Sequence, residues 1–135
     1  MLTENEQKNT YGDHYLVDLH NCNPDLISTV KTVRDVLIEA AVKSKSTIID
    51  DRFHQFEPRG ASGVIIIAES HFSIHTWPER SFAAVDIFTS GSRMEPQIAI
   101  DIMQAGYNAG DVDLIKVTRG SMRGAYLSRD PICDQ

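Results

Sequence analysis

The chain contains the stretch Glu69-Ser70-His71-Phe72-Ser73-Ile74-His75-Thr76-Trp77-Pro78-Glu79, which gathers serine, histidine, carboxylate and threonine side chains around the only tryptophan. The apolar run Val64-Ile65-Ile66-Ile67-Ala68 precedes it and itself follows Gly60-Ala61-Ser62-Gly63. This order is typical of a buried strand that is entered from a tight turn. Because such a strand ends in Glu-Ser-His, it places reactive side chains at the rim of a core, where functional residues often lie.

Apolar and polar residues alternate in several further segments, which predicts strands. The expected strands cover residues 14–20, 46–56, 64–70, 73–77, 82–89 and 111–119. Two other segments repeat apolar residues at steps of three and four, which predicts amphipathic helices. The first helix is expected from Pro24, with Asn23 as its N-cap, to about Lys45. The second is expected to begin near Glu95-Pro96, with Gly110 as its C-terminal cap.

The expected order of elements is β-α-β-β-β-β-α-β, in one domain that spans residues 1–135. Strands that are joined by short turns favour antiparallel pairing, and two amphipathic helices can cover one face of the resulting sheet. We therefore expect an α/β (α+β) two-layer sandwich, with a mainly antiparallel sheet and helices packed on one face. Residues 1–12 and 120–135 are expected to be irregular.

Composition and charge narrow the classes of partner. The formal net charge of −6 disfavours nucleic acid, because binding phosphates requires clustered Lys and Arg. No apolar run is long enough for a membrane span and no signal-peptide pattern is present, so we expect a cytoplasmic protein without a membrane partner. Cys22 and Cys133 lack a C-x-x-C spacing, so we expect two reduced thiols without a disulfide or metal role.

Three interpretations of the central stretch follow from the residues alone. His71 and His75 are four residues apart, but the glutamate of H-E-x-x-H and a third ligand are missing, which disfavours a zinc site. A hydrolase using Ser70, His75 and Asp86 lacks the G-x-S-x-G elbow and an evident oxyanion hole. Hydrogen-bonded polar residues at a strand end are the third interpretation, but they leave the density of functional groups unexplained.

The motif Glu-Ser-His-x-x-Ile-His-Thr-Trp-Pro-Glu resembles that of the bacterial and archaeal S-adenosylmethionine decarboxylase proenzymes. The resemblance covers roughly residues 14–91 and is densest in residues 53–56, 58–79 and 83–89. It implies self-processing, in which the hydroxyl of Ser70 attacks the carbonyl of Glu69 and the peptide becomes an ester. β-Elimination and hydrolysis would then leave a pyruvoyl group in place of Ser70, with a β chain of residues 1–69 and an α chain of residues 70–135.

The resemblance also implies roles for neighbouring side chains. Ser62 matches a processing hydroxyl that steadies the oxyanion, and His75 matches the group that takes the proton removed in the elimination, a role that suits imidazole. The pyruvoyl ketone would form a Schiff base with the substrate's amine and store the electrons released as CO₂ leaves. Glu79 matches an acidic residue that binds the ribose hydroxyls of adenosylmethionine. Phe56 matches an aromatic at the adenine site, although a core position is the alternative.

The chain departs from the family at one position. Where the family has Phe-Thr-Cys-Gly, with the cysteine as proton donor to the carbanion, this chain has Phe88-Thr89-Ser90-Gly91. A thiol with a pKa near 8.5 is a workable acid, whereas an alcohol is far weaker. Either Ser90 donates through water, or His71 or His75 protonates the carbanion, or the reaction has changed.

The leading hypothesis is a pyruvoyl-dependent carboxy-lyase that acts on S-adenosylmethionine for spermidine and polyamine biosynthesis, as a homodimer with active sites near the interface. The departure at Ser90 motivates a second hypothesis, a substrate-shifted arginine or ornithine decarboxylase on the same scaffold. A third hypothesis is an unprocessed, non-catalytic regulatory homologue, which predicts that the chain stays whole.

Overall fold

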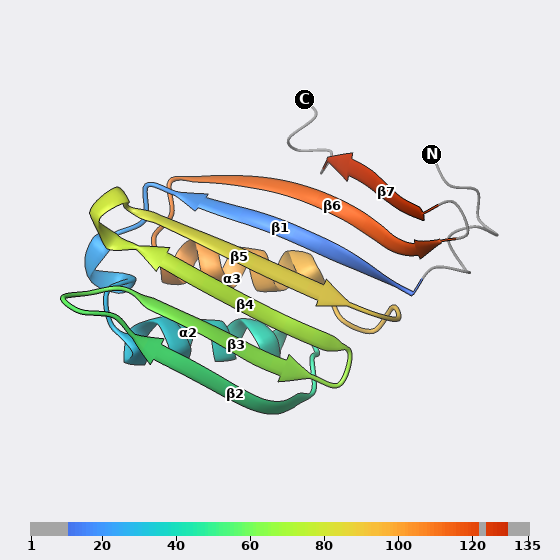
Figure 1. Cartoon of the computed structure of the whole chain (residues 1–135), viewed down its shortest axis with the longest axis horizontal. Coiled ribbons are helices and arrows are strands. Elements are labelled where there is room, and N and C mark those ends of the chain that lie inside the picture. The colour runs from blue at the N-terminus through green and yellow to red at the C-terminus, as the bar shows by residue number, and fades with distance from the viewer. Residues whose placement is uncertain (1–10, 122–123, 130–135) are drawn as a thin grey trace.

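A computed structural model describes residues 11–121 and 124–129 as one antiparallel sheet with helices on one side. The seven strands follow the order β2-β3-β4-β5-β1-β6-β7 (Figure 1). The strands are β1 (Gly12–His20), β2 (Ile48–Gln55), β3 (Ala61–Ile67), β4 (Ser70–Trp77), β5 (Phe82–Thr89), β6 (Asp111–Ser121) and β7 (Gly124–Arg129). Strands β2 to β5 are neighbours in chain order because short turns join them, and β1 lies between β5 and β6.

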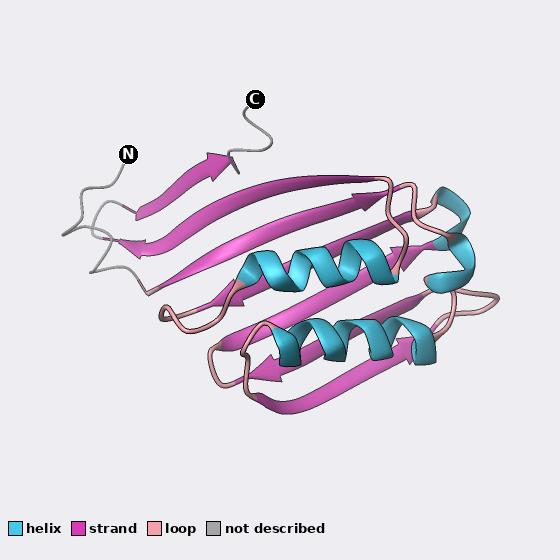
Figure 2. Cartoon of the chain, turned by 180° about the vertical axis from the view of Figure 1, so that it is seen from behind, coloured by secondary structure: helices cyan, strands magenta, loops and turns pink. Residues whose placement is uncertain are grey.

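Two helices, α2 (Val30–Lys43) and α3 (Pro96–Gly106), cover the same face of the sheet (Figure 2). The fully buried side chains of α2 include Val33 and Leu37, which recur at a helical step and face the strands. Buried Tyr107, which follows α3, donates a hydrogen bond of 2.7 Å to the carbonyl of Val33 and ties the helices together. The expected two-layer sandwich is confirmed. Within the described residues, neither helix is long and apolar enough to cross a membrane.

The two faces of the sheet differ in character because side chains alternate along each strand. Residues such as Val17, Phe72 and Val85 point toward the helices and form the core. We call the opposite side the open face. It carries His14, Leu16, Asp18 and His20 of β1, Ser62, Val64 and Ile66 of β3, His71, Ser73, His75 and Trp77 of β4, Phe82, Ala84, Asp86 and Phe88 of β5, and Ile115, Val117 and Arg119 of β6.

The first helix begins later than the sequence predicts. Asn23 does act as an N-cap, accepting a hydrogen bond from the backbone of Asp25, but the element that it caps is the 3₁₀ turn η1 (Pro24–Leu26). The helix α2 begins only at Val30, whose N–H donates to the side-chain Oε1 of Gln55 at 2.8 Å. This cap comes from a residue 25 positions away, so a local pattern could not reveal it.

Three other boundaries are corrected by the structure. The strand predicted over residues 64–70 ends at Ile67, and Ser70 instead opens β4. The second helix ends at Gly106, so Gly110 does not cap it, and Asn108, with φ of 52°, is the residue after the helix that takes the left-handed conformation. The segment 120–135 is not wholly irregular, because β7 pairs with β6. The expectations for residues 1–10 and 130–135, including Cys133, lie outside the described residues.

Candidate active site

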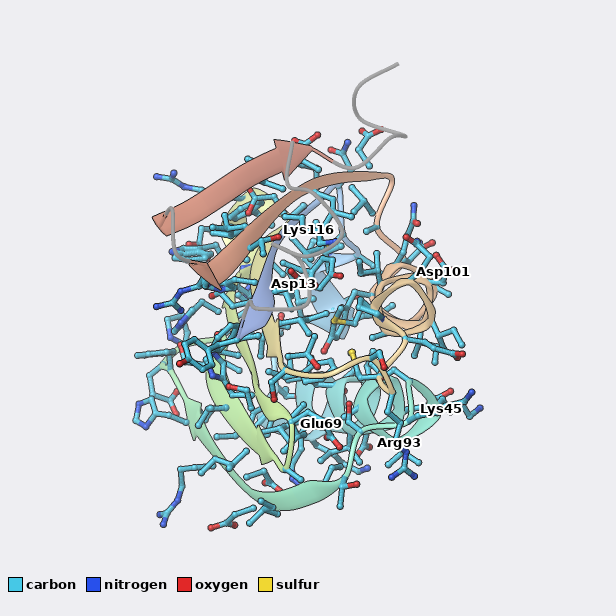
Figure 3. The ribbon with its side chains drawn as sticks, turned by 90° about the vertical axis from the view of Figure 1, so that its right-hand side faces the viewer. Asp13, Lys45, Glu69, Arg93, Asp101 and Lys116 are labelled. Carbon is cyan, nitrogen blue, oxygen red and sulfur yellow. The ribbon has the colours of Figure 1, made fainter. Side chains whose placement is uncertain are left out.

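The Glu69–Ser70 peptide lies in the turn between β3 and β4. Ile67 and Ser70 are paired across the hairpin, so Ala68 and Glu69 form a two-residue turn. The turn is tied to the chain before β2, because the N–H of Ala68 donates to the carbonyl of Thr47 and the N–H of Thr47 donates to the Glu69 carboxylate. Figure 3 looks onto this end of the sheet, where Glu69 is labelled. The peptide predicted to be cleaved is therefore held in one orientation at the rim of the sheet.

Ser90 holds the carbonyl of Glu69 with two hydrogen bonds. Its N–H donates to the Glu69 oxygen at 3.0 Å, and its hydroxyl donates to the same oxygen at 2.8 Å. The family resemblance implies that this carbonyl is attacked by the hydroxyl of Ser70, so the two donors point to the oxygen on which negative charge would develop. Preorganised donors at about 2.7–3.1 Å are the usual form of an oxyanion hole.

His71 lies beside the hydroxyl of Ser70. The Ser70 Oγ is 3.5 Å from the His71 Nδ1, and the His71 ring contacts the rings of Phe88 and His14 at centroid distances of 5.9 and 6.4 Å. Partial burial lowers the pKa of His71, and the nearby His14 lowers it further. The charge of Asp86 raises the pKa of His71, and the charge of Arg119 lowers it. Glu69, Ser70, His71 and Ser90 together form what we call the turn cluster.

Ser62 and His75 form a second pair at the other end of β4. The two residues face each other across β3 and β4, and the Ser62 Oγ lies 2.7 Å from the His75 Nδ1. His75 is five positions beyond Ser70 in an extended strand, which places the two residues roughly 16 Å apart along the strand. Within one chain, the structure therefore brings Ser62 to His75 but does not bring His75 to Ser70.

The two predicted substrate-binding residues lie at this same end. Phe56 directly follows β2, and its N–H donates to the carbonyl of Gly60. The next residue, Ala61, donates its N–H to the hydroxyl of Thr76 near the end of β4. Glu79 is an exposed residue of the 3₁₀ turn η2 (Pro78–Arg80), directly after β4. The side chain of Phe56 is 46% exposed, so the alternative of a core phenylalanine is wrong. We call Phe56, Ser62, His75 and Glu79 the distal cluster.

Asp86 does not complete a triad with Ser70 and His75. Its Oδ1 lies 3.1 Å from the Nε2 of His14, and its Oδ2 accepts a hydrogen bond of 3.1 Å from the hydroxyl of Ser73. The hydrolase interpretation is therefore wrong in its geometry. His14 was not singled out by sequence reasoning, because nothing local indicates that β1 lies beside β5.

Other candidate ligands and thiols are not assembled into a site. His71 and His75 belong to different clusters, and no group of three or more His, Cys, Asp or Glu that could hold a metal ion occurs within residues 11–121 and 124–129. Cys22 is a free thiol in the core, and burial raises its pKa to about 11. A thiol in that environment stays protonated and inert.

Comparison with known proteins places the chain in a family. The family profile described as S-adenosylmethionine decarboxylase matches residues 13–120. The chain is 44% identical over 109 residues to the S-adenosylmethionine decarboxylase proenzyme of Thermodesulfovibrio yellowstonii, a match covering 81% of each protein. It is 40% identical over 111 residues to the proenzyme of the same name from Syntrophomonas wolfei, covering 82% of this chain and 88% of the relative.

A solved structure is similar over nearly the same length. The crystal structure of the adenosylmethionine decarboxylase from Aquifex aeolicus matches with a TM-score of 0.74 and 36% sequence identity, covering 84% of this chain and 92% of that one. Family profile, sequence identity and fold agree over the segment that contains both clusters, and the chain belongs to the S-adenosylmethionine decarboxylase family.

Proposed function

We propose that this protein is a self-cleaving, pyruvoyl-dependent decarboxylase that converts S-adenosylmethionine to its decarboxylated form and CO₂ for polyamine biosynthesis. The observation that carries the proposal is the pair of hydrogen bonds from Ser90 to the carbonyl of Glu69, next to the hydroxyl of Ser70. A peptide carbonyl that is polarised by two donors and followed by a serine is prepared for an internal acyl shift. The residues of the turn cluster thus fit the formation of a pyruvoyl group at position 70.

The chemistry of processing can be written from these residues. The Ser70 Oγ bonds to the Glu69 carbonyl carbon, the peptide C–N bond breaks, and the nitrogen takes up a proton, which leaves an ester. Removal of the Ser70 Cα proton then breaks the Cβ–Oγ bond and releases residues 1–69 with a carboxylate. Hydrolysis of the resulting enamine, as its imine, liberates ammonia. The pyruvoyl carbonyl supplies an electron sink for decarboxylation of an amino acid substrate.

The distal cluster supports a nucleoside substrate. An exposed aromatic ring such as Phe56 can stack on a base and attract a sulfonium, and the carboxylate of Glu79 can accept hydrogen bonds from ribose hydroxyls. The names of the relatives refer to adenosylmethionine, which does not favour the arginine, ornithine or non-catalytic alternatives.

The test combines intact-mass spectrometry with CO₂ release. The purified protein is expected to consist of two chains, and carboxyl-labelled adenosylmethionine is expected to release CO₂ at least tenfold faster than labelled arginine or ornithine. Two chains with faster release from arginine or ornithine would contradict the substrate assignment. A single chain that persists on incubation would contradict the processing itself.

We also propose that the protein acts as a homodimer in which the open faces of two copies pack together. Exposed apolar side chains on that face include Leu16, Ile66, Trp77 and Ile115, and apolar patches of this kind mark interaction surfaces. A two-fold axis between the faces can reverse one β4 relative to the other, which sets the turn cluster of each copy near the distal cluster of its partner. The separation of Ser70 from His75 within one chain supports this arrangement.

Ser90 offers a prediction that separates processing from turnover. Ser90→Ala removes one of two carbonyl donors and keeps the N–H, so the rate of self-cleavage should fall about 100-fold. Ser90→Cys should keep self-cleavage within about tenfold and raise the decarboxylation rate about 10- to 100-fold, because a thiol is the stronger acid. Intact mass over time measures the first rate, and CO₂ release by fully cleaved protein measures the second.

The matched control for Ser90 is Ser92→Ala, in the same loop and exposed, which should change neither rate. Self-cleavage of Ser90→Ala at the wild-type rate would show that the hydroxyl does not stabilise the oxyanion. Unchanged decarboxylation by Ser90→Cys would assign the carbanion's proton to another donor.

A further inference from the structure

His71 contacts the hydroxyl of Ser70, but the roles proposed above for processing and substrate binding do not involve this contact. Its Nδ1 is the only side-chain nitrogen recorded at the Ser70 hydroxyl within the described residues, at 3.5 Å from the Oγ. This distance is long for a hydrogen bond, but catalytic contacts are often long before the reacting geometry forms. His75 is not available for the same task in its own chain, because it lies at the other end of β4 with its Nδ1 against Ser62.

The surroundings of His71 keep the imidazole in its neutral, basic form. Three strands place charged or titratable groups near it: His14 on β1, Asp86 on β5 and Arg119 on β6. The residue across β3 is the apolar Ile66. Burial, His14 and Arg119 lower the pKa of His71, and they outweigh Asp86, which is itself engaged by two partners. A neutral imidazole that carries its proton on Nε2 can accept a proton at Nδ1, whereas a charged imidazolium cannot.

We propose that His71 is the general base of the acyl shift. It takes the proton from the Ser70 hydroxyl as Oγ bonds to the Glu69 carbonyl carbon, and it returns that proton to the Ser70 nitrogen as the C–N bond breaks. The step is balanced, because the proton removed from the hydroxyl is the one added to the nitrogen, and none is exchanged with solvent. This role rests on the proposed self-cleavage but differs from the role of His75, which acts on the Cα proton in the later elimination.

In this proposal the two steps of processing, the acyl shift and the elimination, use different clusters of residues. Ser90, which holds the Glu69 carbonyl, takes the oxyanion role that the resemblance gives to Ser62. The acyl shift then uses only the turn cluster and can proceed within one chain. The elimination requires the distal cluster, which the proposed dimer supplies from the partner. A chain whose distal cluster is disabled should therefore still form the ester, and the ester can be detected because hydroxylamine cleaves esters rapidly and amides slowly.

The experiment measures hydroxylamine-dependent cleavage at Glu69–Ser70 in a His75→Ala background, followed by intact mass. Adding His71→Gln should slow ester formation at least about 100-fold, the usual contribution of a general base. Adding His20→Gln should leave the rate unchanged, because His20 pairs with Asp113 outside both clusters. Adding His71→Ala instead should slow ester formation, and imidazole in the buffer should partly restore the rate. A variant that had merely misfolded would not respond to imidazole.

The pH dependence of the rate of ester formation is a second test of the role of His71. Because burial, His14 and Arg119 lower the pKa of His71 below its ordinary value of 6.5, the fall of the ester-formation rate in acid should be centred at a pH below 6.5. His14→Gln removes a neighbour that lowers this pKa, so the acid limb should move to higher pH. A profile that is flat from pH 5 to pH 8, or His71→Gln with the rate of its parent, would overturn the role of His71 while wild-type self-cleavage continues. Wild-type protein that never cleaves would overturn the proposed function and this role together.

Discussion

The Ser70→Ala protein is expected to remain one chain of 15.1 kDa, while the wild-type protein is expected to divide into residues 1–69 and 70–135. Without the Ser70 hydroxyl, the carbonyl of Glu69 has no adjacent nucleophile, although Ser90 still holds it. Spontaneous hydrolysis of a peptide bond is too slow to compensate, so cleavage should be undetectable over days. Decarboxylation should be lost completely, because alanine cannot yield the ketone that stores the electrons of the reaction.

The fold of Ser70→Ala should persist, since this side chain is only partly buried at the start of β4. Circular dichroism and the urea midpoint should match those of an uncleaved reference, and Ser92→Ala serves as the control that cleaves normally. Two fragments from Ser70→Ala would show that another bond is cleaved, and their masses would identify it.

Two variants that are each unable to complete cleavage, His75→Ala and Ser70→Ala, should complement one another in a mixed dimer. His75→Ala alone should not complete cleavage, and Ser70→Ala cannot begin it. In a dimer of one copy of each, the intact Ser70 of one chain would meet the intact His75 of the other. Coexpression with Ser70→Ala in excess should therefore restore cleavage of most of the His75→Ala chains, while every Ser70→Ala chain stays whole.

Mass tags of different length on the two chains identify which one is cleaved. The matched control replaces the helper with the double variant Ser70→Ala/His75→Ala, which supplies a partner without the imidazole and should restore nothing. Absence of rescue, with a verified mixed dimer, would show that the two clusters do not meet across the interface. Normal cleavage of His75→Ala alone would remove His75 from the mechanism.

Much of the architecture could be predicted because the responsible signals are local. The strand predicted over residues 82–89 coincides with β5, since its alternation follows directly from the pleat of a strand. Pro96 and the apolar steps after it placed the start of α3 correctly. The start of α2 could not be predicted in the same way, because the group that caps Val30 belongs to a distant strand.

The order of residues alone indicates which reactive groups the protein carries: a hydroxyl after an apolar strand, an imidazole next to it, and a serine at the family's cysteine position. Which of these groups lie together depends on the folded sheet. The pairing of β4 with β5 brings Ser90 to the carbonyl of Glu69, while the extension of β4 carries His75 away from Ser70. Residue types and alternation are encoded locally, but distances between side chains depend on strand order and register, which form only when the whole sheet assembles.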